Sequence, residues 1–125
     1  MSKKTKTITI IIAVFTVGFL AVLWAGSRSS GPTPDLTAFA ECLREKNVIM
    51  YGAAWCPHCQ EQKQLFGEAF KNLSYVECPE NPQRCIAAGI EGYPTWVMSN
   101  GEKLVGEQKL ESLAAATGCL LPFSK

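Results

Sequence analysis

Acidic residues are absent from the first 34 positions of this 125-residue chain, and it contains no internal repeat or low-complexity tract. All eleven Asp and Glu residues lie from Asp35 onward, together with only eight of the twelve Lys and Arg residues. That part of the chain therefore carries a formal charge of −3. A mildly acidic domain lacks the basic surface that binds a phosphate backbone, so we expect no nucleic-acid partner.

Charged side chains are also missing between Ile8 and Ala25, where Ile, Val, Leu, Phe and Ala predominate. At about 1.5 Å of rise per residue, a helix of this length just crosses the hydrocarbon core of a bilayer. Lys3, Lys4 and Lys6 precede the run, and the positive-inside rule then keeps the N-terminus cytoplasmic. The sequence predicts a single-pass membrane protein whose domain lies on the extracytoplasmic side, periplasmic or lumenal.

A cleaved signal peptide is the alternative to this anchor, because Ala25-Gly26-Ser27 offers the small residues found at cleavage sites. The apolar run is longer than the usual signal-peptide core of about 7–15 residues, which favours the anchor. Residues 27–35 are polar and rich in Gly, Pro and Ser, as flexible linkers are. We therefore divide the chain into a membrane anchor at 1–26, a linker at 27–35 and a folded domain at 36–121.

Hydrophobic periodicity in the folded domain predicts an α/β fold. Apolar residues recur at helical spacing in some segments, and short apolar runs typical of strands lie between them. The expected helices are 36–43, 56–73, 81–89 and 110–117, and the expected strands are 48–51, 75–78, 95–98 and 103–105. The order helix, strand, helix, strand, helix, hairpin, helix predicts a mixed central sheet with helices on both faces.

Two local patterns make this prediction more specific. The second helix is expected to begin at Cys56, with Pro57 in its first turn, where the missing N–H costs nothing. Asn100-Gly101 between the last two strands predicts a hairpin whose two turn residues both tolerate positive φ. The core face of the second helix is expected to consist of Leu65, Phe66, Ala69, Phe70 and Leu73.

Six cysteines are a high count for so short a chain. A reducing cytosol rarely requires so many, so the count indicates an oxidising compartment, a metal site or redox chemistry. Two of them, Cys56 and Cys59, bracket two residues at the start of the second helix. Side chains three apart in a helix share a face, so these two sulfurs can bond without much backbone movement.

The helix start predicts which of the two sulfurs reacts. Unpaired N–H groups there stabilise a thiolate on Cys56, and an imidazolium on His58, the only histidine, would add to this effect. We expect Cys56 to be the exposed nucleophile, Cys59 the shielded resolving or leaving thiol, and Pro57 the residue that stiffens the turn. A stabilised thiolate favours the dithiol, which predicts a potential toward the oxidising end of a span of roughly −270 to −120 mV.

Two other interpretations of the C-x-x-C are open. It can be half of a zinc site, completed here by Cys78, Cys85 or His58, or it can be a static structural disulfide. The preceding strand and Trp55 favour redox chemistry over both. We therefore expect no metal and no cofactor.

The segment Trp55-Cys56-Pro57-His58-Cys59 resembles the active site of the thioredoxin superfamily, and its Pro-His dipeptide resembles that of periplasmic disulfide oxidases. Ile90-Glu91-Gly92-Tyr93-Pro94-Thr95 is similar to that superfamily's loop of Gly, an apolar residue, cis-Pro and Thr. The resemblance implies a thioredoxin-like fold in which a cis proline lies opposite the cysteine pair and the backbone before it pairs with a bound peptide. The implied substrate-binding residues are Trp55, Tyr93, Pro94 and Thr95.

Residues 37–118 include the segments Tyr51-Gly52-Ala53, Gln60 to Phe70, Tyr75-Val76-Glu77-Cys78 and Ala88-Gly89-Ile90. With these segments they resemble the thioredoxin-like domain fused to bacterial and plant vitamin K epoxide reductase homologues. In that family the domain relays electrons from the thiols of secreted proteins to a membrane quinone reductase. The resemblance implies that this chain docks on a separate membrane enzyme of that type.

Four cysteines lie outside the C-x-x-C motif. The related fused domains imply a Cys78–Cys85 bridge, which would stabilise a small core or serve as a second relay pair. Cys42 lies on the first expected helix and Cys119 follows the last one. In the thioredoxin fold these two helices usually pack on opposite faces of the sheet, so we expect no bridge between the two cysteines. Trp96 is expected in the core rather than in a peptide groove.

One departure from thioredoxin concerns the buried acid before its active site, which assists proton removal from the second cysteine. That acid would fall at Met50 here, and its absence favours an oxidant or relay role. The sequence leaves three alternatives open: a membrane-tethered reductant of the cytochrome c maturation type, a non-catalytic zinc-binding or structural module, and a substrate-binding adaptor for a membrane reductase.

Overall fold

The computed structural model describes residues 8, 12, 16 and 34–122. The chain divides into two structural units, residues 1–33 and 34–125. Apart from residues 8, 12 and 16, the predicted anchor lies outside the described residues, and so do residues 27–33 of the predicted linker. Within the described part of the chain, no helix is both long and apolar enough to cross a membrane.

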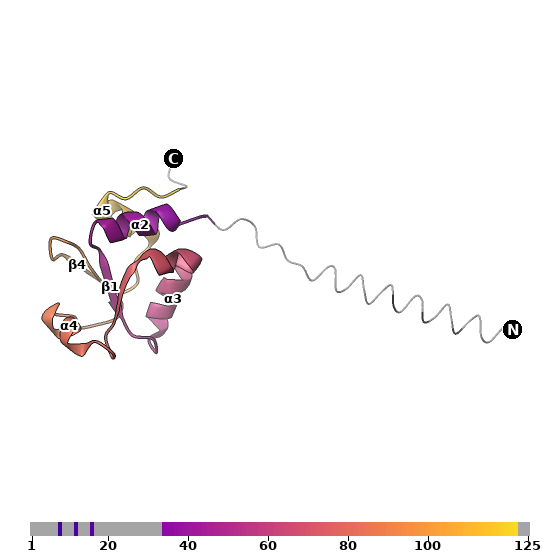
Figure 1. Ribbon diagram of the computed structural model, residues 1–125, viewed down its shortest axis with the longest axis horizontal. Coiled ribbons are helices and arrows are strands. Elements are labelled where there is room, and N and C mark those ends of the chain that lie inside the picture. Colours follow the sequence, from indigo (N-terminus) through magenta and orange to yellow (C-terminus); the bar gives the residue numbers. More distant parts are fainter. Residues whose placement is uncertain (1–7, 9–11, 13–15, 17–33, 123–125) are drawn as a thin grey trace. The chain divides into compact units, whose positions relative to one another are not determined.

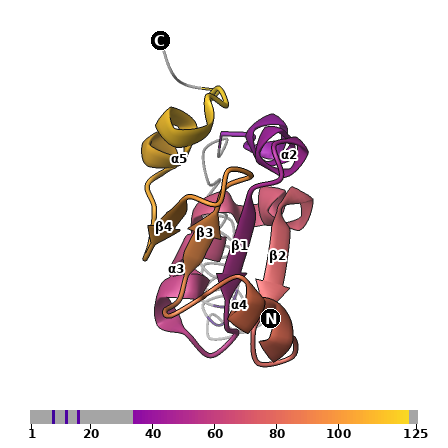
Figure 2. The same ribbon diagram turned by 90° about the vertical axis from the view of Figure 1, so that its left-hand side faces the viewer.

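Four strands form one mixed sheet in the order β2-β1-β3-β4 (Figure 2). β1 runs parallel to β2 and antiparallel to β3, and β3 pairs antiparallel with β4. The strands are β1 (Ile49–Gly52), β2 (Ser74–Glu77), β3 (Thr95–Val97) and β4 (Lys103–Val105). The predicted mixed sheet is confirmed, and the observed strand ends lie within one residue of the predicted ones.

Helices cover both faces of this sheet. Figure 1 shows α3 and α4 on opposite sides of it. Met50 of β1 points into a large apolar cluster to which α2, α3 and α5 contribute, whereas Tyr51, the next residue, points into a smaller cluster beside α4. This alternation along β1 is what a sheet buried on both faces requires. The helices are α2 (Thr37–Glu45), α3 (Pro57–Phe66), α4 (Pro82–Ala87) and α5 (Leu110–Thr117), with the 3-10 helix η1 (Gly67–Asn72) directly after α3.

The predicted second helix is wrong in its second half and in part of its core face. α3 ends at Phe66 because Gly67 takes φ +53°, and the chain continues as a 3-10 helix. Leu65, expected in the core, is 46% exposed, while the polar Gln62 is only 1% exposed. Cys59, Gln62 and Phe66 are the buried residues of α3, and their spacing of three and four residues defines a face from which Leu65 is turned away.

The expectation that Cys42 and Cys119 do not pair is also wrong, because a disulfide joins them. Gly118 ends α5 in the left-handed conformation, and the chain beyond it returns to the large apolar cluster. Phe39 of α2 and Leu113 of α5 belong to that same cluster. α2 and α5 therefore share one core rather than lying on opposite faces, and this arrangement brings the two sulfurs together.

The hairpin between β3 and β4 forms as predicted, but with a different turn. Gly101 has φ +84°, whereas Asn100 does not take a positive φ. The Gly101 N–H donates to the carbonyl of Met98 at 2.9 Å, and the Asn100 side chain accepts from the Glu102 N–H at 2.9 Å. Only the glycine requires the left-handed conformation, as in the three-residue hairpin loops that follow a type I turn with a glycine.

Candidate active site

The end of β1 and the start of α3 position the cysteine pair. Cys56 is the N-cap residue of α3, Pro57 occupies its first turn, and Cys59 follows within that turn. Both cysteines carry free thiols in the structure. Cys56 is 6% exposed and Cys59 0%. The expectation of an exposed Cys56 is therefore wrong, because both cysteines are buried, but Cys56 is the more accessible of the two.

The proline loop lies against this pair. The Tyr93–Pro94 peptide bond is cis, as the resemblance implies, and Cys56 Sγ lies 3.8 Å from the backbone oxygen of Tyr93. The Thr95 hydroxyl donates to the Gly92 carbonyl at 2.8 Å. The Pro94 carbonyl accepts from the backbone N–H of Gly106, the first residue after β4, at 2.7 Å. These bonds fix the loop next to the Cys56 sulfur.

Two aromatic side chains border the site. Trp55 is 69% exposed, and its ring lies edge-on to that of Tyr93 with centroids 6.1 Å apart. Trp96 is fully buried, which confirms it as a core residue. The exposed apolar surface beside Cys56 is therefore supplied by Trp55 and, in part, by Tyr93.

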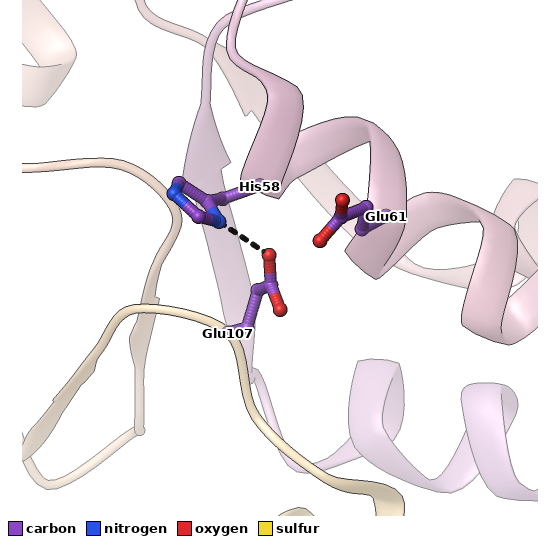
Figure 3. A group of neighbouring side chains, drawn as sticks. All are labelled: His58, Glu61 and Glu107. Atoms are coloured by element: carbon purple, nitrogen blue, oxygen red, sulfur yellow. Dashed lines mark hydrogen bonds and ion pairs between the residues drawn. The ribbon is translucent and has the colours of Figure 1, made fainter.

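His58 has a partner that the sequence did not reveal. Its Nδ1 lies 2.6 Å from Glu107 Oε1, in the loop between β4 and α5 (Figure 3). The hydrogen bond from His58 holds the pKa of Glu107 below its ordinary value, while a hydrogen bond to Glu107 raises the pKa of Glu61. A histidine paired with a carboxylate contributes less positive field to its surroundings than a free imidazolium does.

The buried Gln62 explains why Glu107 is held at that position. Its amide oxygen accepts from the Gln108 N–H at 2.6 Å, and its amide nitrogen donates to the Gln108 carbonyl at 3.0 Å. The Trp96 indole N–H lies 3.4 Å from the same oxygen. Gln62 thus connects α3 to Gln108, the residue next to Glu107. The sequence signal for this contact was a polar residue on the core side of a predicted helix.

The zinc-site interpretation of the C-x-x-C does not fit the described residues. Cys78 and Cys85 are joined to each other in a disulfide and cannot act as thiolate ligands. His58, Glu61 and Glu107 have potential ligand atoms within 4.8 Å of one another, but all three residues are exposed, and His58 and Glu107 already bond to each other. We assign no metal to this group.

The Cys78–Cys85 disulfide links the end of β2 to α4, as the resemblance implied. Both cysteines are buried in the smaller apolar cluster with Tyr51 and Val76. A bridge whose sulfurs are covered in this way suits a structural role better than a role as a second relay pair.

Burial controls the ionisation of Cys59. It raises the pKa of the Cys59 thiol from 9.0 to about 11, with the neighbouring Cys56 acting in the same direction. The folded protein keeps the Cys59 proton to a higher pH than the unfolded chain does. This difference contributes fully to the stability of the fold only while the unfolded thiol is still protonated. The stabilisation is therefore complete below about pH 9 and is lost as the pH rises toward about 11.

We expect the free energy of unfolding of the reduced protein to fall by about 2–3 kcal/mol more than that of the oxidised protein between pH 9 and pH 11. The oxidised form has no Cys59 or Cys56 thiol to titrate. All other titratable groups are common to the reduced and oxidised forms. Urea denaturation at several pH values measures the difference, and a reduced Cys59→Ala variant isolates Cys59 from Cys56. Parallel pH profiles for the reduced and oxidised proteins would contradict this account.

Gly52, at the end of β1, lies beside the Cys59 side chain. A Cβ atom at this position would lie 2.8 Å from Cys59 Sγ and 3.2 Å from the ring of Tyr75. We expect Gly52→Ala to destabilise the reduced protein by about 1–3 kcal/mol, because buried neighbours must move. Gly92→Ala is the matched control, since its nearest neighbour would lie 3.9 Å away. Equal denaturation midpoints for the two variants would contradict the claim that a Cβ at position 52 destabilises the fold by crowding Cys59.

Comparisons with known proteins place this domain in a family. The thioredoxin family model matches residues 35–117. The chain is 46% identical to the thiol-disulfide oxidoreductase LTO1 of Arabidopsis thaliana over 72% of its own length and 26% of that protein. It is 29% identical to the protein disulfide-isomerase of Humicola insolens over 82% of its own length and 22% of that protein.

Among solved structures, a mutant thioredoxin from Halobacterium salinarum is 22% identical, with a TM-score of 0.48 over 70% of this chain and 86% of that one. This chain spans only about a quarter of the length of the two curated relatives. The family model, in contrast, covers the whole α/β domain from α2 to α5. The chain belongs to the thioredoxin family.

Proposed function

We propose that this chain is a thiol–disulfide oxidoreductase whose Cys56–Cys59 pair exchanges a disulfide with the thiols of protein substrates. The observation that carries the proposal is the position of Cys56 at the start of α3, with its sulfur 3.8 Å from the backbone oxygen of Tyr93 in the cis-proline loop. Cys59, fully buried behind it, is placed to resolve a mixed disulfide. Both curated relatives carry names of the same chemistry.

The cycle follows from the order of the two sulfurs. In the oxidising direction, a substrate thiolate attacks Cys56 Sγ, the Cys56–Cys59 bond breaks, and Cys59 leaves as a thiolate that takes up a proton. A second substrate thiolate then attacks the substrate sulfur of the mixed disulfide and releases Cys56. The substrate gains a disulfide, and the pair gains two electrons and, at Cys59, one proton.

Substrates approach Cys56 past Trp55 and the proline loop. Trp55 and Tyr93 offer apolar contact area, and the backbone next to Pro94 can pair with an extended peptide. The Thr95 hydroxyl keeps this backbone in place through its bond to the loop. We assign substrate binding to these four residues and thiol chemistry to Cys56 and Cys59, with Pro57 and His58 shaping the turn between them.

An oxidant or relay role fits the surroundings of the pair. The N–H groups at the start of α3 favour an anionic Cys56 sulfur, and Met50 stands fully buried where thioredoxin has an acid. The contact between His58 and Glu107 limits the positive field that His58 can add at Cys56. We therefore place the reduction potential between the limits of roughly −270 and −120 mV, rather than at the oxidising limit.

The compartment and the partner belong to the same proposal. Two disulfides besides the active pair support an oxidising compartment, which agrees with an anchor at residues 1–26 and an extracytoplasmic domain. The electron acceptor we propose is a membrane quinone-linked reductase of the vitamin K epoxide reductase type. A membrane-tethered reductant of the cytochrome c maturation type is the alternative, and a potential near that of thioredoxin would favour it.

A trapping experiment in the native membrane tests this function. Cys59→Ala leaves Cys56 without a resolving thiol, so substrates and the acceptor should accumulate as mixed disulfides that a reductant releases. The matched control is the double variant Cys56→Ser with Cys59→Ala, which should trap nothing. A substrate-binding adaptor would give no disulfide-linked species with either variant, and that result would overturn the proposal.

A further inference from the structure

Cys59 has to lose its proton when it resolves a mixed disulfide, and its surroundings oppose this. Burial raises the pKa of its thiol to about 11, so only a minute fraction is ionised at neutral pH. Met50, on the strand before the active site, offers no acid. A proton acceptor therefore has to come from another element of the fold.

β2, the neighbour of β1, provides a carboxylate. Glu77 pairs with Gly52 in the parallel register of the two strands. Its Oε2 accepts from the Tyr75 hydroxyl at 2.5 Å, and its Oε1 accepts from the Ala54 N–H at 2.8 Å. The carboxylate is thus fixed both to the active-site loop and to a tyrosine on its own strand.

The Tyr75 hydroxyl and the Cys59 sulfur lie beside the same glycine, Gly52. Cys59 Sγ and Tyr75 Oη both lie within 3.3 Å of the position that a Cβ atom on Gly52 would occupy. The absence of a side chain at Gly52 is what allows the two groups to approach each other. Negative charge on Cys59 also raises the pKa of the Tyr75 hydroxyl, as expected for two neighbouring groups.

The other charged groups that act on Cys59 and Tyr75 lie on α3. Cys56 raises the pKa of the Cys59 thiol and Lys63 lowers it. The Lys63 ammonium lies 4.0 Å from the centre of the Tyr75 ring. Burial, followed by the bond to Glu77, raises the pKa of Tyr75 far above its ordinary value, so the phenol remains protonated and can pass a proton only by receiving one at the same time.

We propose that the Glu77 carboxylate, acting through the Tyr75 hydroxyl, accepts the thiol proton of Cys59 in the step that resolves the mixed disulfide. Cys59 Sγ attacks Cys56 Sγ, the Cys56–acceptor bond breaks, and the acceptor leaves as a thiolate. The Cys59 proton passes to the Tyr75 oxygen as the Tyr75 proton passes to Glu77. Glu77 is a positioning residue in this step, and the inference rests on the proposed function.

The test uses the reduced full chain and the disulfide 5,5′-dithiobis(2-nitrobenzoate). Attack by Cys56 releases one coloured thiolate at a rate proportional to reagent concentration, and attack by Cys59 then releases the second at a rate independent of it. We expect Glu77→Gln to slow the second phase at pH 7 by at least about tenfold and to leave the first phase unchanged. Glutamine keeps an acceptor for the Ala54 N–H, so the loop remains in place.

Three further measurements separate a proton path from a structural effect. Tyr75→Phe should slow the second phase similarly, and the double variant should be no slower than the slower single variant, because both act on one path. In Glu77→Gln the second phase should rise about tenfold per pH unit from pH 7 to 9, whereas the wild-type rate should change little. Glu80→Gln, which removes an exposed charge nearby, should behave as wild type.

The two proposals fail in different ways in this experiment. A second phase within twofold of wild type in Glu77→Gln, or losses that multiply in the double variant, would overturn the assignment of Glu77 and leave the proposed function standing. Absence of the first phase in the wild-type chain would overturn the proposed function itself. A loss of both phases in Glu77→Gln alone would indicate a displaced active-site loop and would also contradict the assignment.

Discussion

A Cys56→Ser variant should lose thiol–disulfide exchange by at least about a thousandfold. Serine has nearly the same volume as cysteine but cannot form the mixed disulfide, and no other free thiol in the described residues replaces it except the fully buried Cys59. The loss should appear in the turnover rate with a reduced peptide substrate. Circular dichroism should show an unchanged fold, because the substitution adds no atom to a close-packed site.

The matched variant for this prediction is Cys59→Ser. It keeps the nucleophile, so it should react once with a disulfide reagent and then stop as a mixed disulfide. Cys56→Ser should not react even once at a comparable rate. Equal single-turnover rates for the two variants would mean that the roles of the cysteines are not those assigned here.

Replacing Cys42 and Cys119 together by Ala should lower the free energy of unfolding by about 4–5 kcal/mol. The bridge joins residues 77 apart in the sequence, so it closes most of the domain into one loop and removes much of the entropy of the unfolded chain. It also fixes α2 to the segment after α5, and both contribute to the large apolar cluster. For a small domain, a loss of this size approaches the total stability.

The Cys78–Cys85 pair provides the control within the same chain. Its cysteines are only seven apart, and the same entropy relation gives about 2–3 kcal/mol for its removal. Guanidinium denaturation of the two double-alanine variants, both with the active pair oxidised, measures the difference. A larger loss for the Cys78–Cys85 variant would show that local contacts, rather than loop length, determine the contribution of these bridges.

Local patterns in the sequence were sufficient for the strands, the β3–β4 hairpin and the start of α3. The apolar run of β1 and the glycine of the β3–β4 hairpin each contain the information needed to form that structure. The start of α3 is similar, because Pro57 at the first turn both permits the helix and places Cys56 before it. These features do not depend on contacts between distant residues.

Sequence reasoning missed two features of the core that depend on such distant contacts. Cys42 and Cys119 meet only because α2 and α5 share a core. Gln62 replaces Leu65 in the interior because its amide bonds to the loop before α5. A prediction from helical periodicity depends on apolar character alone. It does not detect the hydrogen bonds that a buried polar residue makes to a backbone distant in the sequence.

The contacts of Glu107 and Glu77 with the active site also depend on residues that are distant in the sequence. Glu107 reaches His58 from a loop 49 residues away, and Glu77 reaches the active-site loop from a neighbouring strand. The sequence signal for Glu77 was an acid at the end of a predicted strand parallel to the one before the C-x-x-C. Such a position places a carboxylate at the edge of the sheet where the active site lies, once the strand register is known.

A redox titration of the full chain tests the central claim most directly. The protein is equilibrated with mixtures of reduced and oxidised glutathione, quenched with acid and alkylated, and each cysteine pair is quantified by peptide mass. Our account predicts that Cys56–Cys59 interconverts as a two-electron couple with a midpoint between roughly −270 and −120 mV, while Cys42–Cys119 and Cys78–Cys85 remain oxidised. A Cys56–Cys59 pair that stays in one state across the whole series would contradict it.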